Sequence, residues 1–168
     1  ILESFNDDLA VSGLLSDEKM DEVLKRHEDT LKFIFIRTWT NSAWTPQDEE
    51  EAQGMLTSEL LPGDDLCLFV SAVTLSLMEC FDLRKIMWLL DAYRHTNVNV
   101  SQRALVGAMI IFHIYRNRLT FYPELIKRVD LMEEIPWFIE DVARIYRQML
   151  LCQETAVSYT HLTLPTTP

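Results

Sequence analysis

Two uncharged, strongly apolar stretches set the main limit on how this chain folds. They are "LCLFVSAVTLSLM" (residues 66–78) and "ALVGAMIIFHIY" (residues 104–115). Each is shorter than the roughly 18 residues that an apolar helix needs to cross a bilayer. We therefore predict two helices buried inside a protein core, each covered on more than one side, and no membrane span.

Elsewhere the apolar residues are spaced three and four apart, which is the pattern of amphipathic helices. Helix-start signals at Ser16, Thr45-Pro46 and Asp82 reinforce this pattern. Only four glycines and no hairpin turn signal occur, which argues against a β-sandwich or barrel. We also keep the β-like run "KFIFIRTW" (residues 32–39) helical. The predicted helices span residues 17–37, 46–61, 64–80, 83–94, 101–115, 119–132 and 136–155.

The chain also shows a weak internal repeat. Shifting the sequence by 36 residues places residues 65–93 on residues 101–129 and aligns four identical residues. Each segment reads as a mostly buried helix, a tight break and an amphipathic helix, as in helical-repeat solenoids. We predict an all-α fold of stacked antiparallel helix pairs, an α–α superhelix with about seven or eight helices. Small residues at Ala104, Gly107 and Ala108 predict close helix packing.

The expected organisation has three parts. Residues 1–62 form N-terminal helices, residues 63–155 form two-helix repeat units plus a final helix, and residues 156–168 form a tail. Because the chain starts at Ile1, we expect it to lie inside a longer protein. The tail string "VSYTHLTLPTT" resembles a translated sequencing adapter, and the alternative is a native disordered terminus. Pro165 and the β-branched residues of this tail oppose continuation of the last helix.

Residues 68–125, together with "WTPQDEEEAQ" (residues 44–53) and "RQMLLCQET" (residues 147–155), carry a family resemblance. The chain resembles, over about residues 1–155, a family of large uncharacterised bacterial proteins, largely metagenomic, with tetratricopeptide-like or HEAT-like helical repeats. The tetratricopeptide pattern of Trp, Leu, Gly and Tyr does not recur in both units, so HEAT-like or armadillo-like units fit at least as well. The resemblance implies a helical repeat and supplies no catalytic residue.

Composition excludes several functions. The formal net charge of −11 argues against general nucleic-acid binding, which needs clustered bases. Three widely spaced cysteines, Cys67, Cys80 and Cys152, fit neither a disulfide framework nor a zinc site. We predict that they are small buried hydrophobic residues in a reducing compartment, here the bacterial cytoplasm.

Catalytic motifs are missing. No P-loop, GxGxxG, GxSxG or HExxH sequence occurs. The histidines His27, His95 and His113 have no ligand at metal-binding spacing, and a core histidine is favoured over a pairing of His113 with Cys80. We read the acidic run at residues 48–51 as a solvated helix start and the tryptophans as packing residues, with Trp44 as an alternative surface anchor. We predict no catalytic, metal-binding or cofactor-binding residue and no cofactor.

One surface feature remains. Residues 92–123 contain no acid and four arginines, accompanied by tyrosines. We predict a local positive rim that binds an acidic protein segment or a phosphate. The alternative is that acids on neighbouring helices neutralise these arginines. This arginine–tyrosine rim comprises Arg94, Arg103, Arg116, Arg118, Tyr115 and Tyr122.

The sequence therefore favours a non-enzymatic helical-repeat scaffold segment that mediates protein–protein interaction within a larger bacterial protein. The alternative is an all-α structural portion of a multidomain enzyme whose active site lies outside this chain. Both readings leave the identity of the protein partner and the oligomeric state open.

Overall fold

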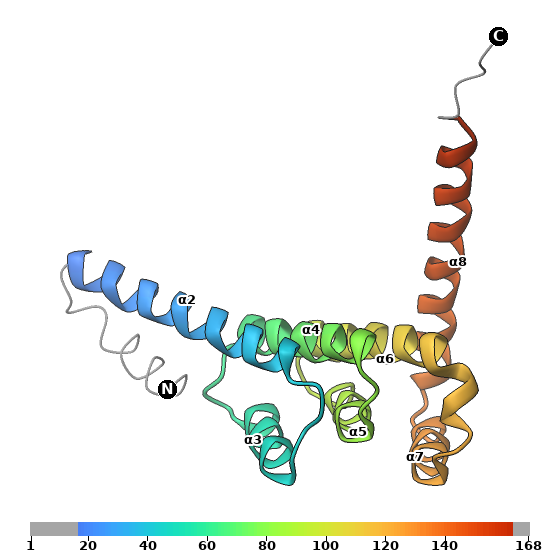
Figure 1. Ribbon diagram of the computed structural model, residues 1–168, viewed down its shortest axis with the longest axis horizontal. Coiled ribbons are helices and arrows are strands. Elements are labelled where there is room, and N and C mark those ends of the chain that lie inside the picture. The colour runs from blue at the N-terminus through green and yellow to red at the C-terminus, as the bar shows by residue number, and fades with distance from the viewer. Residues whose placement is uncertain (1–16, 163–168) are drawn as a thin grey trace. The chain divides into compact units, whose positions relative to one another are not determined.

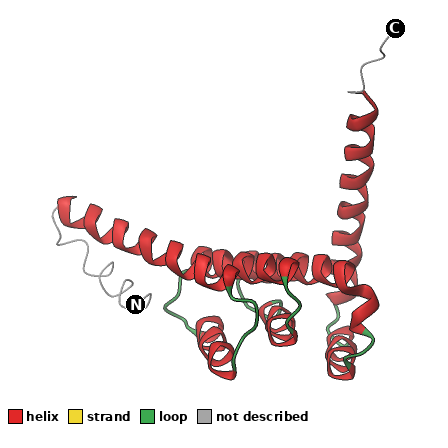
Figure 2. Ribbon diagram, viewed as in Figure 1, coloured by secondary structure: helices red, strands yellow, loops and turns green. Residues whose placement is uncertain are grey.

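All regular structure in the described part of the chain is α-helical (Figure 2). The computed structural model describes the backbone of residues 17–162 and the side chains of residues 19–152. The predicted all-α fold is confirmed. Its seven described helices are α2 (Asp17–Thr40), α3 (Pro46–Thr57), α4 (Gly63–Glu79), α5 (Leu83–Ala92), α6 (Val98–Leu119), α7 (Pro123–Glu133) and α8 (Phe138–Leu162).

Two predicted helix starts are confirmed by their hydrogen bonds. At the start of α3, Thr45 Oγ1 accepts from the Asp48 N–H at 3.2 Å, and Asp48 Oδ2 accepts from the Thr45 N–H at 2.9 Å. Pro46 occupies the first turn, where its missing N–H costs nothing. At the start of α5, Asp82 Oδ1 accepts from the Lys85 N–H at 3.1 Å. The predicted cap at Ser16 lies outside the described residues.

Helix α6 differs from its predicted range at both ends. It begins at Val98 because Asn97 Oδ1 accepts from the Asn99 N–H at 2.9 Å, which caps the first turn. It continues to Leu119 through a kink at Tyr115, where φ is −101° and ψ is 16°. The next helix starts only at Pro123, so residues 115–122 hold the end of one helix and a turn.

The chain divides into two compact units, one ending at Arg118 and one beginning at Leu119. The predicted boundary at residues 62/63 runs through the first unit, where α2 packs on α4. The second predicted repeat unit, residues 101–129, is shared between the two units.

The second unit contains α7 and α8, which contact each other. Helix α8 continues to Leu162, so the prediction that the last helix ends near residue 155 is wrong. Valine and threonine lower helix propensity by less than about 1 kcal/mol each, and the first proline of this region is Pro165. Residues 163–168 of the predicted tail lie outside the described residues.

In the first unit, α2 and α4 run in the same direction. His27 Nε2, in the middle of α2, lies 3.1 Å from Asp65 Oδ2 near the start of α4. Further along both helices, the Ser76 hydroxyl near the end of α4 donates at 2.8 Å to the carbonyl of Asn41, which follows α2. Because both partners advance together along the chain, the two helices are parallel neighbours.

Helix α6 packs on α4 with the same polarity. Arg103 Nη1 donates to Ser71 Oγ at 2.9 Å, and the Tyr115 hydroxyl donates to the Leu77 carbonyl at 2.9 Å. Between these contacts, a Cβ added at Gly107 would overlap the Thr74 side chain. The predicted close approach of these two helices is therefore present at Gly107.

Helices α3 and α5 lie below α2 and α4 in Figure 1, where they are seen nearly end-on and therefore cross α2 and α4 steeply. Arg37, at the end of α2, lies 3.6 Å from a carboxylate oxygen of Asp48 at the start of α3. Arg84 of α5 pairs with Glu49 of α3 at 3.1 Å. In the first unit, α2, α4 and α6 thus form one parallel row and α3 and α5 form a second.

Aromatic side chains fill the space between these rows. The rings of Trp44 and Phe69 stack with centroids 6.4 Å apart, and Trp88 meets the Phe69 ring edge-on at 5.2 Å. The packing role predicted for Trp44 and Trp88 is confirmed, and the alternative of a surface anchor at Trp44 is wrong. Trp39 and Trp137 are exposed, so the inter-helix packing predicted for them is wrong. Trp39 instead contacts Phe35 of the same helix edge-on, with ring centroids 6.3 Å apart.

Candidate functional site

The structure distributes the predicted arginine–tyrosine rim over several places. Arg94 follows the end of α5, Arg103 lies in the first turns of α6, and Arg116 and Arg118 lie in its last turn. Tyr122 precedes α7 in the second unit. In the first unit the rim residues therefore do not form one continuous cluster.

Two rim residues near the end of α6, Tyr115 and Arg118, both contact Phe81. The Tyr115 ring contacts the Phe81 ring edge-on at 5.2 Å, and the Arg118 guanidinium lies 4.4 Å from the centre of the same ring. Burial raises the pKa of Tyr115 above its ordinary value of 10.0. Because the Tyr115 hydroxyl is bonded to a carbonyl of α4, we assign this residue to packing, and Arg118 to a cation–π contact.

The rim arginines have no carboxylate partner among the described residues. The described ion pairs include none with Arg94, Arg103, Arg116 or Arg118. Arg103 instead donates to a serine hydroxyl, and Arg116 Nη1 donates to the His113 carbonyl at 3.4 Å. Direct pairing with neighbouring acids therefore does not account for their charge in this part of the chain.

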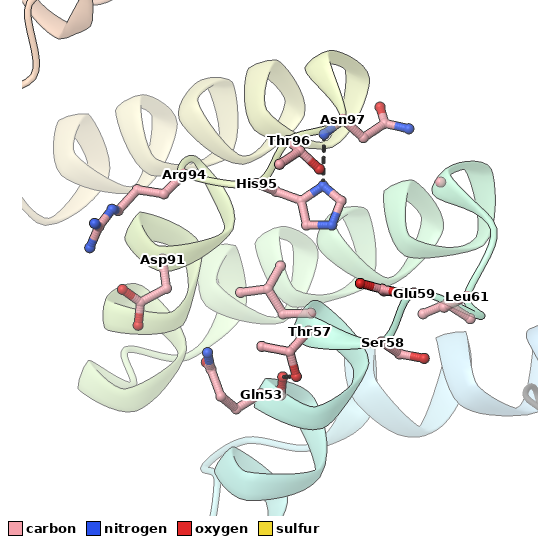
Figure 3. Close-up of a pocket in the computed structure, with 12 residues that line it drawn as sticks. Gln53, Thr57, Ser58, Glu59, Leu61, Asp91, Arg94, His95, Thr96 and Asn97 are labelled. Carbon is pink, nitrogen blue, oxygen red and sulfur yellow. Dashed lines mark hydrogen bonds between the residues drawn. The ribbon is translucent and has the colours of Figure 1, made fainter.

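One rim arginine lines a cleft, which is the candidate functional site (Figure 3). The cleft has a volume of about 810 Å³ and lies between the end of α3 with its following loop and the turn that joins α5 to α6. Its size falls in the range of small-ligand and peptide pockets. It is lined by Gln53, Leu56, Thr57, Ser58, Glu59, Leu61, Gly63, Asp91, Arg94, His95, Thr96 and Asn97.

A hydrogen bond within the α5–α6 turn fixes the tautomer of His95. The Asn97 backbone N–H donates to His95 Nδ1 at 3.0 Å. Since Nδ1 accepts this bond, a neutral His95 ring carries its proton on Nε2. Figure 3 shows the ring pointing into the space that Gln53 and Thr57 face. The cleft therefore receives an N–H donor from His95.

Glycine is needed where the two sides of the cleft meet. Any Cβ at Gly63 would overlap the side-chain amide of Asn97. The same Asn97 side chain caps α6 through its Oδ1, so it is held in place from the other side. Gly63 thus allows the start of α4 to approach the α5–α6 turn closely.

The cleft offers binding groups rather than a reactive pair. It combines the amides of Gln53 and Asn97, several hydroxyls, the carboxylates of Glu59 and Asp91 and the guanidinium of Arg94 with apolar contact at Leu56 and Leu61. With Nδ1 occupied, His95 presents a donor and not a proton acceptor to the cleft. Such a mixture of donors and acceptors matches the alternating N–H and C=O groups of an extended peptide.

Periodicity over residues 83–94 predicts that Lys85 lies off the apolar face formed by Ile86, Leu89 and Leu90, but the structure buries this lysine. Its side chain is fully buried. Lys85 Nζ donates to the Asn41 carbonyl and, at 2.8 Å, to Ser76 Oγ, and it lies 5.8 Å from the Trp44 ring centre. Burial lowers the pKa of Lys85 below its ordinary value of 10.5, and the charge of Asp82 opposes this shift.

The histidines and cysteines also differ from their predicted surroundings. His27 of α2 pairs with Asp65 of α4, with His27 Nε2 3.1 Å from Asp65 Oδ2. His113 is exposed, so a core position for it is wrong. Cys67 is buried as predicted, and burial raises the pKa of its thiol, whereas Cys80 and Cys152 are exposed, contrary to prediction. In the described part of the chain all three cysteines are free.

Among the described residues, no three His, Cys, Asp or Glu side chains lie together in a group that could hold a metal ion. No described helix combines the length and apolar character needed to span a membrane.

Comparison with known proteins adds no assignment. No protein-family model matches the chain, and neither a curated protein nor a solved structure is significantly similar to it.

Proposed function

We propose that this chain is a non-enzymatic helical-repeat scaffold whose cleft binds an extended segment of a protein partner. The parallel row of α2, α4 and α6, with α3 and α5 in a second row against it, supports the helical-repeat part of this proposal. The single observation that carries the binding part is the polar cleft of about 810 Å³ with the His95 Nε2–H turned into it.

The bound segment is expected to be extended and to carry an acidic side chain. Gln53 can both donate to and accept from a peptide main chain, and His95 can donate to a peptide carbonyl. Arg94 is exposed at the cleft and has no ion pair with a described carboxylate, so it is placed to meet a carboxylate of the partner. A folded domain would fit a cleft of this size poorly.

The test is to select peptides that bind the full chain from a displayed random library and then to measure their affinity. Gln53→Ala should weaken binding by roughly 2- to 13-fold, the cost of one neutral hydrogen bond. Gln102→Ala is the matched control, because Gln102 is also exposed but lies outside the cleft. Selected peptides should carry an Asp or Glu at the position that meets Arg94, and not an acidic run, because Glu59 and Asp91 also line the cleft.

A second pair of variants separates the cleft from the end of α6. Arg94→Glu should abolish binding of the selected acidic peptides, and Arg116→Glu with Arg118→Glu should leave it unchanged. The reverse result would move the binding site to the end of α6. Failure to select any peptide that depends on Gln53 or Arg94 would refute a peptide-binding role for the cleft.

A further inference from the structure

Helix α2 carries an exposed face whose counterparts in the next two helices of its row are buried. Its residues are spaced four, three and four apart, which places them on one side of the helix. The Phe33 and Ile36 side chains are 65% and 57% exposed. We call this the α2 outer face and define it as Asp29, Phe33, Ile36 and Thr40.

In α4 the equivalent face, 36 residues later in the sequence, is fully buried and is the side that receives α2. Asp65 lies against His27 of α2, and Ser76 Oγ donates to the Asn41 carbonyl that follows α2. Phe69 stacks on Trp44. This face comprises Asp65, Phe69, Ala72 and Ser76.

In α6 the side that receives α4 has the same spacing and is also buried. Gly107 on this side packs against Thr74 of α4. The face comprises Val100, Ala104, Gly107 and Ile111. The α6 face starts at Val100, 35 residues after the α4 face starts at Asp65. This shift is one residue shorter than the 36-residue repeat found in the sequence. Each of these helices therefore accepts the preceding member of the row on this side.

We propose that the α2 outer face binds an amphipathic helix of a protein partner, which lies parallel to α2 and extends the row by one member. The binding mode continues the interface already formed between α2 and α4. The partner helix should carry an apolar stripe for Phe33 and Ile36 and an imidazole or a base for Asp29. The surface is separate from the cleft, so this inference goes beyond the peptide-binding function.

The chemistry of the partner follows from α2 itself. The side of α2 that docks on α4 presents His27 to Asp65 and buries Thr38. Asp29 occupies the place on α2 that Asp65 occupies on α4. A second copy of the chain is a poor occupant, because the docking side of its own α2 is covered by its α4.

The probe is therefore a synthetic peptide of residues 17–42, which carries the docking side of α2 with no α4 to cover it. Binding of the labelled peptide to the full chain is measured by fluorescence anisotropy. The double variant Phe33→Ala with Ile36→Ala of the full chain should bind the peptide at least about tenfold more weakly, as for central apolar anchors of an interface.

The matched control is Phe121→Ala with Ile139→Ala, which removes the same two side-chain types at exposed positions of the second unit. This variant should bind the peptide as the wild type does. All four substituted positions are exposed, so both variants should keep the helical circular dichroism signal and melting temperature of the wild type. Gln53→Ala and Arg94→Glu should leave peptide binding unchanged, which separates this inference from the function of the cleft.

A charge test checks the register of the docked helix. Asp29→Asn in the full chain should weaken binding of the wild-type peptide but not of a peptide with His27→Ala, since each change removes the same contact. If the peptide bound the wild type and the Phe33/Ile36 double variant equally well, the proposal would be overturned. The peptide would then not be using the α2 outer face, and would instead be displacing α2 from its site on α4. The proposal would also be overturned if the wild-type full chain formed dimers and the Phe33/Ile36 double variant did not. A second copy of the chain would then be the occupant of the α2 outer face.

Discussion

Lys85 shows how a single charged residue can be buried without a carboxylate in contact. Its amine is bonded to the Asn41 carbonyl and to the Ser76 hydroxyl, which come from the end of α2 and from α4. Asp82 uses its two carboxylate oxygens on the backbone N–H groups of Trp44, at 2.6 Å, and of Lys85. The network therefore joins three helices at the turns between the two rows, and the desolvated charge is its costly element.

Replacing Lys85 by methionine should leave the free energy of unfolding unchanged or raise it by about 1–2 kcal/mol at neutral pH. Methionine fills a similar volume, and the Ser76 hydroxyl still donates to the Asn41 carbonyl. Urea unfolding followed by circular dichroism measures this change. Lys127→Met, at an exposed position of α7, is the control.

The same variant tests the pKa shift. Since the pKa of Lys85 is lower in the folded than in the unfolded state, the unfolded state holds its proton to higher pH. Wild-type stability should therefore gain a contribution as pH rises through the folded-state pKa toward 10.5. This contribution should vanish in Lys85→Met and persist in Lys127→Met. An unchanged pH slope in Lys85→Met would contradict the assignment.

At the scale of helices, two glycines in helices are predicted to behave in opposite ways. Gly107→Leu should destabilise the first unit by about 1–3 kcal/mol, because α6 would be forced away from Thr74 of α4. Gly54→Leu in α3 should be neutral or stabilising, since nothing lies within 4 Å of a Cβ there. Thermal melting compares the two variants. A wild-type melting temperature in Gly107→Leu would show that the two helices are not closely packed.

Local signals predicted the helices well, because the bonds that start a helix lie within a few residues. Thr45, Pro46 and Asp82 are such signals, and each begins a helix. The Asn97 cap is equally local, but the predicted helix begins at residue 101, three residues after the observed start of α6. Periodicity predicts which face a residue occupies only when its polarity matches its surroundings, which is why it failed for Lys85.

The site was harder to predict, because its parts are distant in the sequence. The cleft joins Gln53 and Thr57 to His95, and no pattern in the chain links these positions. The arginine-rich segment was visible, but only Arg94 of that segment lines the cleft. The absence of acids in residues 92–123 predicts a positively charged segment. It does not predict where in the fold each arginine of that segment lies.

At the scale of the whole molecule, the three cysteines provide probes of both units. Cys80 and Cys152 are exposed and should react rapidly with a thiol reagent in the native protein. Cys67 is buried in the first unit and should react only when that unit opens. Time-resolved labelling followed by mass spectrometry measures the three rates. A variant with Cys80→Ser and Cys152→Ser isolates the slow thiol, and rapid native labelling of that variant would contradict the described burial.

The shared direction of α2, α4 and α6 has an electrostatic consequence. Parallel helices add their macrodipoles, so their unpaired carbonyls gather at one edge of the row and make it electronegative. Arginine side chains lie in the last helical turns at this edge. They are Arg37 in α2, and Arg116 and Arg118 in α6. The arginines that lack a described carboxylate partner at the end of α6 thus lie where the peptide backbone itself supplies the opposing partial charge.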